Sequence, residues 1–441
     1  YVSPKPDPRL ANIGTSVLIA EIDSTQDRIP IKDPDVFRKK TSMNTVGIGD
    51  ELIRYQSVSE TSPWYLEGCQ RGAWNTMSAS HASGDAISKL MDHGYRVFLS
   101  NADLSMEVAR NIGDLFNQTG LSQVSFDGLE GNWSTGMGQY GRTLFTKAWY
   151  DHLKPELKGT IINDASNPGH YNWHIYTRMN WGEPWYAGFR ESQTLYRLKN
   201  QAYYSRNLMP RMLGWFQMNA STSLEDIAWL LARAGGFDAG FALVTSPNTV
   251  AQNGIGEAIL ETVKQWETAR ISGAFPDEIK PKLQDIENEF ELKPTGENKW
   301  DLSPVYSFKT DHMHNEQPGM IAFSTYDFEN PYDEQSVQFI IQSTGKSPAV
   351  DVTLELNQSH VQDLSTLLEP GHILKYTGGS EVITYDDKWQ EKHRININPA
   401  ALKVPNGKQS IRLGYRFEGN EPALKMELRT VGEPWHLQAG K

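Results

Sequence analysis

The order of apolar and polar positions along the chain predicts three kinds of structure. Near the N-terminus, short runs alternate with period two, as in 50–59, which is typical of β-strands. In the middle, strand-like and helix-like runs alternate, which is the pattern of an α/β domain. Towards the C-terminus the runs alternate again without a helical period, which favours a β-sandwich. We therefore predict a small β module over 1–90, a (β/α) barrel catalytic domain over 91–290 and a β-sandwich over 300–441.

The predicted barrel domain begins with a strand, a helix and a second strand. Residues 95–100 have strand character, and 105–116 carry apolar residues spaced three and four apart, as on one face of a helix. The second strand is 123–126, and Asp127 follows it directly. Since a helical crossover joins parallel neighbouring strands, we expect Asp127 at the carboxyl end of a parallel sheet. Ligands gather at that edge, whereas a helix cap or turn is the structural alternative for this aspartate.

The same alternation of strands and helices continues beyond Asp127. Residues 159–164 favour a strand that ends in Asp164, 37 residues further on, which is about one βα repeat. Further strands are predicted over 209–217 and 237–244. Between them we expect a helix over 224–234 that Thr222 and Ser223 cap and that Gly235 and Gly236 end. We expect an α/β fold with a (β/α)8-type barrel that is incomplete in this chain, because the predicted strands are too few to close it. An upstream fragment or a second chain would then complete the barrel.

Composition points towards a carbohydrate ligand. The net charge of −12 argues against a nucleic-acid partner, because binding phosphates needs clustered lysine and arginine. Mean hydropathy is −0.54, and no apolar run approaches the ~20 residues of a membrane span. The single cysteine excludes an intramolecular disulfide. Thirteen tryptophans are more than a core requires, and seven of them lie between 133 and 229. Sugar rings stack on such flat side chains, so a carbohydrate is the first ligand we infer.

An aromatic segment follows the strand that ends in Asp164. Seven of the twenty residues 171–190 are aromatic, and charged and amide side chains lie between them. A core segment would show a cleaner apolar period. We interpret the segment as a substrate-binding loop, with a packed hairpin as the alternative. The candidate substrate-binding residues are His170, Trp173, His174, Tyr176, Arg178, Asn180, Trp181, Glu183, Trp185 and Trp215.

Metal binding is weakly indicated. His170 and His174 have the i, i+4 spacing of two ligands on a helix, but Gly169 and the aromatic crowding argue against a helix, and no third ligand is evident. We predict no cofactor and no catalytic metal, with a structural calcium ion at an acidic string as the alternative to a solvated loop. That string is Asp327, Glu329, Asp333 and Glu334.

The N-terminal module carries the pattern Arg71-Gly-Ala-Trp74-Asn-Thr76, followed by His81 and Gly84. It resembles a small β module that recurs in phage-tail and polysaccharide-degrading proteins, where its role is mostly structural or adhesive. We expect Arg71, Thr76 and His81 to form internal hydrogen bonds rather than ligand contacts.

A strand ending in Phe-Asp-Gly, a neighbouring strand with an acidic end, an aromatic rim and a trailing β-sandwich resemble the bacterial multidomain TIM-barrel glycoside hydrolases of polysaccharide utilisation. Over 91–270 the chain is most similar to endo-α-N-acetylgalactosaminidase-like and α-galactosidase-type barrels. The resemblance implies that Asp127 is the nucleophile and that a carboxylate on the following strand is the acid/base. Asp164 stands at that position with Glu130 as its rival, whereas those enzymes often carry glutamate. It also implies a periplasmic, cell-surface or secreted protein.

The function we predict is hydrolysis of a glycosidic bond in a complex poly- or oligosaccharide by two carboxylates. Two alternatives remain open. A polysaccharide lyase would use His170, Tyr176 and Arg178 to abstract a proton and to neutralise a uronate. A non-catalytic carbohydrate-binding or adhesin protein would keep the aromatic residues without needing both acids.

Overall fold

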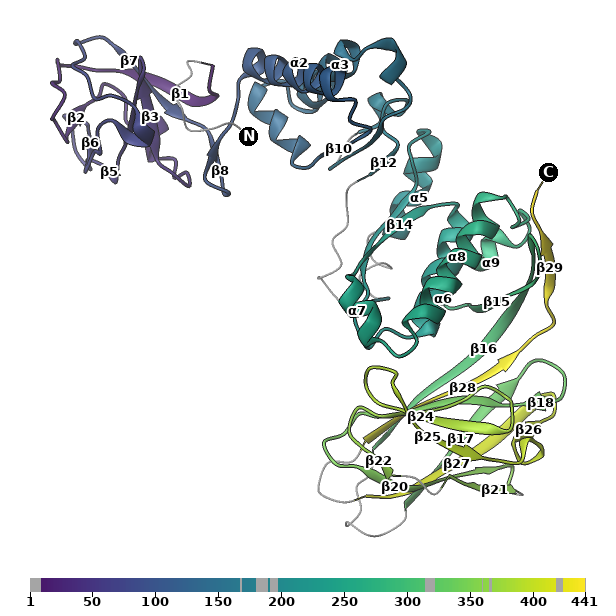
Figure 1. Cartoon of the computed structure of the whole chain (residues 1–441). Helices are drawn as coiled ribbons and strands as arrows, with labels where there is room; N and C mark the ends of the chain where they lie inside the picture. The colour runs from purple at the N-terminus through teal and green to yellow at the C-terminus, as the bar shows by residue number, and fades with distance from the viewer. Residues whose placement is uncertain are drawn as a thin grey trace. The chain divides into compact units, whose positions relative to one another are not determined.

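The structure is a computed structural model of the whole chain. Its contacts divide the chain into two compact units, Tyr1–Trp181 with Tyr204–Pro210, and Gly182–Tyr203 with Arg211–Lys441. In Figure 1 the first unit begins in purple and the second ends in yellow. The structure describes residues 9–166, 169–179, 189–190, 197–313, 322–358, 360–364, 367–417 and 423–440.

The first unit begins with a small β module made of two antiparallel sheets. Its short strands alternate between side chains that enter an apolar cluster, such as Val46, Ile53 and Ile87, and side chains that face outwards. A short helix, α1 (Asp35–Arg38), packs its Phe37 into the same cluster. The sheet orders are β1 (Asn12–Val17), β7 (Ala86–Leu90), β3 (Thr45–Ile48), β4 (Glu51–Arg54), and β2 (Ile29–Pro30), β6 (Tyr65–Glu67), β5 (Ser57–Val58).

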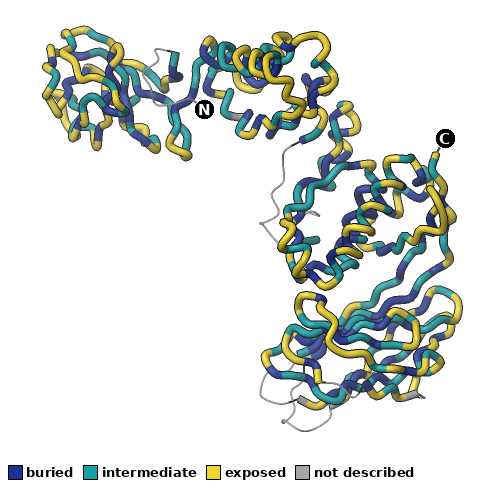
Figure 2. The backbone as a smooth tube through the Cα atoms, viewed as in Figure 1, coloured by how far each residue is buried: buried dark blue, intermediate teal, exposed yellow. Residues whose placement is uncertain are grey.

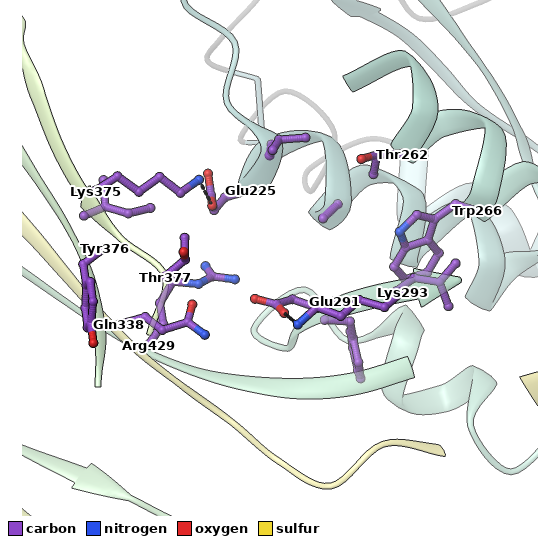
Figure 3. A pocket seen from close by; sticks show the side chains of 15 residues that line it. Glu225, Thr262, Trp266, Glu291, Lys293, Gln338, Lys375, Tyr376, Thr377 and Arg429 are labelled. Carbon is purple, nitrogen blue, oxygen red and sulfur yellow. Dashed lines mark hydrogen bonds and ion pairs between the residues drawn. The ribbon is translucent and has the colours of Figure 1, made fainter. Parts of the chain in front are cut away.

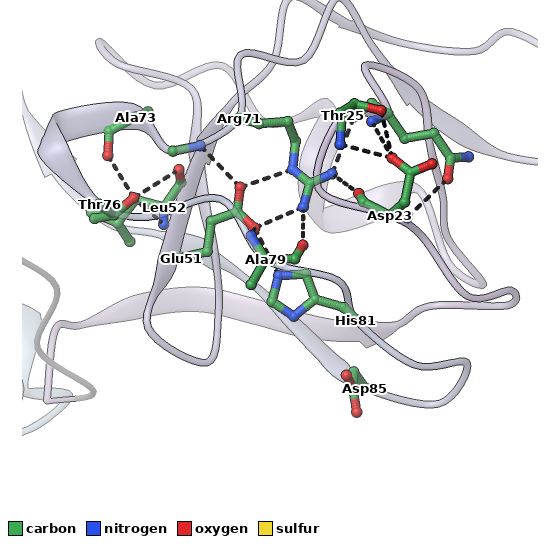
Figure 4. Close-up of polar contacts among 12 residues, drawn as sticks. Asp23, Thr25, Glu51, Leu52, Arg71, Ala73, Thr76, Ala79, His81 and Asp85 are labelled. Atoms are coloured by element: carbon green, nitrogen blue, oxygen red, sulfur yellow. Dashed lines mark hydrogen bonds and ion pairs between the residues drawn. The ribbon is translucent and has the colours of Figure 1, made fainter.

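A buried carboxylate joins distant parts of this module. Glu51, at the start of β4, is 1% exposed. It accepts hydrogen bonds from Nε and Nη2 of Arg71 at 2.8 and 2.7 Å and lies 2.8 Å from Nε2 of His81 (Figure 4). The backbone N–H groups of Gly72 and Ala79 donate to it as well. Burial alone would raise the pKa of Glu51, but these donors outweigh burial and lower the pKa to about 2.

Thr76 forms hydrogen bonds to the backbone of two segments beside this carboxylate. Its hydroxyl accepts from the backbone N–H of Leu52 at 3.1 Å and donates to the carbonyl of Ala73 at 2.8 Å (Figure 4). The internal hydrogen bonding that the sequence predicts for Arg71, Thr76 and His81 is therefore confirmed.

The rest of the first unit is an α/β layer. Asn101 caps its first helix by accepting from the backbone N–H of Leu104 at 3.0 Å, and Gly120 ends that helix in the left-handed conformation. Both helices of the layer bury one face in a cluster with Phe126 and Trp149. The elements are α2 (Ala102–Thr119), α3 (Gln139–His152) and three parallel strands in the order β10 (Gln123–Phe126), β11 (Ile162–Ala165), β12 (Arg178–Met179).

The structure differs from the prediction of a parallel strand over 95–100. Only β9 (Val97–Phe98) is a strand there, and it pairs antiparallel with β8 (Asp92–His93) instead of parallel with β10. The chain reverses between them, and Arg96 adopts a φ of +58° in the turn. Phe98 is fully buried in an apolar cluster that also contains residues of the β module. The strand-like run therefore reflects burial against the β module rather than a place in the parallel sheet.

The second unit begins with a helical layer around a parallel strand pair. Ser223 caps α6 as predicted, but the helix continues through Gly235 and Gly236 and ends at Phe237. A Cβ on Gly236 would lie 2.8 Å from the backbone nitrogen of Gln284, so this glycine permits close packing rather than ending the helix. The elements are α5 (Arg197–Arg206), β13 (Met212–Gln217), α6 (Leu224–Phe237), β14 (Gly240–Val244), α7 (Pro247–Gln252), α8 (Gly256–Ile271) and α9 (Lys280–Gln284).

The C-terminal part of the second unit forms two antiparallel sheets around one apolar cluster, which includes Phe339, Leu354 and Leu428. Their strands appear largely in dark blue and teal in Figure 2, where buried and half-buried positions follow one another. One sheet has the order β15 (Glu289–Gly296), β16 (Lys299–Met313), β28 (Ala423–Val431), β19 (Gln338–Ser343), β23 (Ile373–Tyr376), β24 (Glu381–Tyr385), β25 (Glu391–Asn396), with β29 (Trp435–Gln438) on β16. The other has the order β17 (Ala322–Asn330), β27 (Gly407–Phe417), β20 (Ala349–Leu356), β21 (His360–Asp363), with β22 (Leu367–Leu368) on β20.

The predicted barrel is present only as strand–helix elements. Within the described ranges, β10, β11 and β12 form one parallel sheet and β13 and β14 another, and these strands do not close into an eight-stranded barrel. Helices α2, α3 and α6 lie between successive strands, as in a βα repeat. Strand β12 was not predicted, because its two residues lie inside the aromatic segment. None of the helices in the described ranges is long and apolar enough to cross a membrane.

Candidate active site

The two predicted catalytic aspartates lie on neighbouring strands of the first unit. Strands β10 and β11 are parallel, and Ser125 pairs with Asp164 in their register. Asp127 is the first residue after β10, and Gly128 then takes a φ of +73° that turns the chain into the 3-10 helix η2 (Leu129–Thr135). Both acids therefore stand at the carboxyl ends of β10 and β11. The parallel neighbour of the Asp127 strand is β11, and not the strand at 95–100 on which the prediction for Asp127 rested.

The two aspartates differ in their surroundings. Asp127 is exposed, whereas the side chain of Asp164 is only 15% exposed. Its Oδ1 is shielded from water and has no hydrogen-bond partner among the described residues. Its Oδ2 lies 3.7 Å from Nε of Arg178, which is its register partner on β12. A carboxylate oxygen left unpaired in this way is costly in free energy unless a proton or a ligand group satisfies it.

A cavity of about 210 Å³ lies beside Asp127. It is lined on one side by α2, through Ser105 and Val108, and on the other by the end of β10 and by η2. Ser105 and Asn132 join the two sides by a hydrogen bond of 2.6 Å. The cavity thus places hydroxyl and amide groups next to the exposed carboxylate.

Exposed aromatic side chains follow each of the two acid-bearing strands. After β10 come Trp133 in η2 and Tyr140 in the first turn of α3, which are 50% and 59% exposed. After β11 come Tyr171 in η4 (His170–Asn172) and Trp173, which are 66% and 48% exposed. Water-exposed rings of this size are the usual surface for stacking a sugar. They belong to the segments that follow β10 and β11, the strands at whose carboxyl ends Asp127 and Asp164 stand.

Trp133 and Tyr140 were missed by the sequence reasoning, which concentrated on the longer aromatic segment. A signal was available, because Trp133 stands in a loop of glycine, serine and threonine directly after the Asp127 strand. An aromatic residue in such a loop has no apolar period to explain it as part of a core.

Among the predicted substrate-binding residues, His170, Trp173 and His174 lie at the surface. The imidazole of His170 stacks on the ring of Tyr171 with centroids 4.4 Å apart, and Trp173 meets His174 edge to face at 5.4 Å. The rings of Tyr171 and Trp173 therefore pack against these two histidines. Arg178 is half-buried on β12, where it pairs with Asp164 in the register.

Tyr176 requires a correction. It is 4% exposed and belongs to the apolar cluster around Phe126 and Trp149. Its hydroxyl is hydrogen-bonded to Thr146 of α3. Burial in this cluster is the first cause that raises its pKa above the usual tyrosine value. Tyr176 is thus a core residue whose polar tip is satisfied internally, and it is not available to a substrate.

The remaining predicted residues fall outside this arrangement. Trp215 is a half-buried residue of β13 and belongs to the second unit. Glu130 lies within η2, but its side chain is outside the described residues, so its part as a rival proton donor stays a prediction. The predicted residues that lie wholly outside the described ranges are Asn180, Trp181, Glu183 and Trp185.

Across the described residues, no three or more His, Cys, Asp or Glu side chains come together in a group that could hold a metal ion. This holds for the described pair His170 and His174 and for the acidic string that begins at Asp327. Both metal alternatives remain without a ligand set in the part of the chain that the structure describes.

No family model matches the sequence, and no curated protein matches it. Three solved structures show distant similarity. The isomalto-dextranase of Arthrobacter globiformis T6, complexed with panose, is 11% identical over 73% of this chain and 72% of that chain, with a TM-score of 0.28. An Anoxybacillus α-amylase is 9% identical over 73% and 64%, with a TM-score of 0.25. A GH30 endoxylanase of Clostridium papyrosolvens C71 is 11% identical over 74% and 76%, also at 0.25. Similarity this low decides neither the fold nor the activity of the chain.

Proposed function

We propose that this chain is a glycoside hydrolase that cleaves a glycosidic bond of a poly- or oligosaccharide with Asp127 and Asp164. One observation carries the proposal: two aspartates stand at the carboxyl edge of adjacent parallel strands, and exposed aromatic rings follow both strands. Paired carboxylates are the groups that glycosidic hydrolysis requires, and flat exposed rings are the groups that hold a sugar beside them.

The environments of the two acids favour different roles. Asp127 is exposed, so its carboxylate is free to approach the anomeric carbon of a sugar as nucleophile. Asp164 is enclosed and has one unpaired oxygen, which suits a group that carries a proton to the leaving oxygen. The guanidinium of Arg178 is 3.7 Å away, beyond direct hydrogen-bonding distance, and its side chain is 39% exposed.

The aromatic rim would set how the substrate lies. Trp133 and Trp173 come from different loops, after β10 and after β11, so together they can contact successive sugar units on either side of the acids. Ser105 and Asn132 in the adjacent cavity supply polar groups for sugar hydroxyls.

A polysaccharide lyase is less well supported. Its base in the sequence-based hypothesis includes Tyr176, whose hydroxyl is buried and bonded to Thr146. A binding protein without activity needs the aromatic rim but makes no use of an enclosed carboxylate with an unpaired oxygen.

The test is a product-release screen over algal and host glycans with the full chain, Asp164→Asn and the control Asp151→Asn. Asp151 is exposed on α3, and its carboxylate forms an ion pair with Lys147. We expect reducing sugar from the wild type and the control, and a loss of about 100-fold or more for Asp164→Asn if it is the proton donor. An unsaturated product detected by absorbance would instead show a lyase. Sugar binding with no product from any glycan would show a binding protein.

A further inference from the structure

A second cavity, of about 390 Å³, lies in the second unit. It is bounded by helices α6 and α8 on one side and by strands β15, β19 and β23 of the larger sandwich sheet on the other (Figure 3). Its volume is within the range of ordinary small-molecule sites. Lys293 stands at its lining with a side chain that is 70% exposed, so the cavity is open to solvent there.

Two buried polar atoms at this cavity have no hydrogen-bond partner among the described residues. One is Oε2 of Glu225, near the start of α6, and the other is Nε1 of Trp266 on α8. Trp266 is 1% exposed, and Figure 3 shows the nitrogen of its indole towards the cavity. A buried acceptor and a buried donor that are both unpaired carry a desolvation cost, and a ligand that bonds to them removes it.

The carboxylate is held in its charged form. Oε1 of Glu225 accepts from Nζ of Lys375 at 2.6 Å, and Arg429 also lines the cavity. Burial would raise the pKa of Glu225, but the charges of Lys375 and Arg429 outweigh it and lower the pKa. Glu225 is therefore a strong acceptor at neutral pH, and its second oxygen requires a donor.

The chemistry of the lining selects a ligand rich in hydroxyl groups. Glu225 needs a donor and Trp266 needs an acceptor, and a hydroxyl can serve as either. The amide of Gln338 adds both kinds of group, and Figure 3 shows it on the sheet side of the cavity. The two carboxylates of the lining, Glu225 and Glu291, share it with three cationic side chains, so it presents charges of both signs, and a neutral ligand is repelled by neither.

We propose that this cavity binds a neutral mono- or disaccharide, as a site separate from the acid pair of the first unit. The site has its own donors and acceptors and needs neither Asp127 nor Asp164. Hydrolysis at the acid pair and binding in this cavity can therefore fail independently.

The experiment is calorimetric titration of the full chain with glucose, galactose and maltose. It compares the wild type with Trp266→Phe and Ala228→Leu. The phenylalanine variant retains a ring to stack on Phe275, whose centroid lies 5.7 Å from that of Trp266, and it loses the N–H donor together with part of the indole, so its melting temperature is measured alongside. Ala228 is a half-buried lining residue of α6, and a leucine there would take up part of the cavity.

We expect at least one of the three sugars to bind the wild type, Trp266→Phe to bind it about fivefold to tenfold more weakly, and Ala228→Leu to lose it. Trp173→Ala tests the rim of the first unit as the alternative location, and the matched control is Tyr95→Ala, at an exposed ring outside both proposed sites, which should leave the binding unchanged. Loss with Trp173→Ala but not with Trp266→Phe would place the sugar at the first unit and overturn the proposal. Absence of binding by the wild type would leave a cavity filled by solvent alone, and would overturn it as well.

Discussion

Glu51 and Asp164 are both enclosed carboxylates, but their hydrogen-bond partners differ, and we propose a structural role for Glu51 and a catalytic role for Asp164. Glu51 has donors on both oxygens, from Arg71, His81 and two backbone N–H groups. Asp164 has one oxygen without a partner among the described residues and lies at the edge of a sheet. A carboxylate with hydrogen-bond donors on both oxygens stabilises the fold around it. A carboxylate with an unpaired oxygen near the carboxyl end of a strand can instead bond to a substrate.

The first residue-scale prediction concerns Glu51 and pH. Its pKa falls from 4.5 to about 2 on folding, so its stabilisation is complete above the unfolded value and is lost as pH falls through the folded value. A shift of this size corresponds to about 3 kcal/mol. We expect Glu51→Gln to unfold more easily at neutral pH and to lose the wild-type pH dependence between about 4.5 and 2. Chemical denaturation across this range measures it, with exposed Glu21→Gln as control. Equal stability of Glu51→Gln and the control at pH 7 would contradict the structural role.

The second residue-scale prediction concerns Trp173, which is 48% exposed. Because it is not part of a core, Trp173→Ala should leave the melting temperature unchanged. A stacked ring contributes about 1 kcal/mol, so we expect KM to rise roughly fivefold while kcat stays the same. Tyr95→Ala, at an exposed ring of the β module, is the control. A lower melting temperature with an unchanged KM would show that Trp173 packs rather than binds.

At the scale of elements, η2 depends on its packing against the start of α3. Gly141 lies where an added Cβ would be 2.6 Å from the backbone oxygen of Asn132 and 2.5 Å from Oγ1 of Thr135. The backbone cannot move aside there without displacing the loop that carries Trp133. Close approach, rather than a positive φ, is thus the reason for glycine at this position.

Gly141→Ala should therefore destabilise the chain by roughly 1–3 kcal/mol, as other forced overpacking does, and should also weaken substrate binding through Trp133. The matched change is Gly94→Ala, where nothing lies within 4 Å of the added Cβ. Thermal melts and KM for both variants measure the effect. If the two variants behave alike, η2 is not held by this contact.

At the scale of the whole molecule, local patterns predicted elements better than their arrangement. The helix over 105–116 and the strands before Asp127 and Asp164 were visible because apolar spacing reports which face is buried. The run at 95–100 and the pair Gly235–Gly236 misled, because burial against the β module and close packing on α9 are set by distant residues. The prediction of a barrel did not say correctly which strands pair, for the same reason. The spacing of apolar residues within one segment does not determine which other strand it pairs with. The positions of Asp127 and Asp164 near strand ends were predictable from the local pattern. The core position of Tyr176 was not, because it depends on Thr146 and on tertiary packing.

The second unit gives a prediction at this scale. One apolar cluster contains residues of α6, α8 and α9 together with Phe290, Trp300 and Leu437 of the larger sandwich sheet. Trp300 is 2% exposed, and its indole donates to Gln265 of α8 at 2.8 Å. Trp300→Ala should cost about 3–5 kcal/mol. Helix and sheet signals should then be lost in one transition of the second unit, measured by circular dichroism during heating. Loss of the sheet alone would show that the helical layer folds by itself.

The most direct measurement of the proposed activity is the turnover of Asp127→Asn on whichever glycan the wild type cleaves. The substitution keeps the shape of the side chain and removes the charge that attacks the sugar, and Asp127 is exposed, so folding should be unaffected. We predict a fall in kcat of about 1,000-fold or more with an unchanged melting temperature, while Asp151→Asn retains full activity. A kcat for Asp127→Asn within about tenfold of the wild type would contradict catalysis by this aspartate.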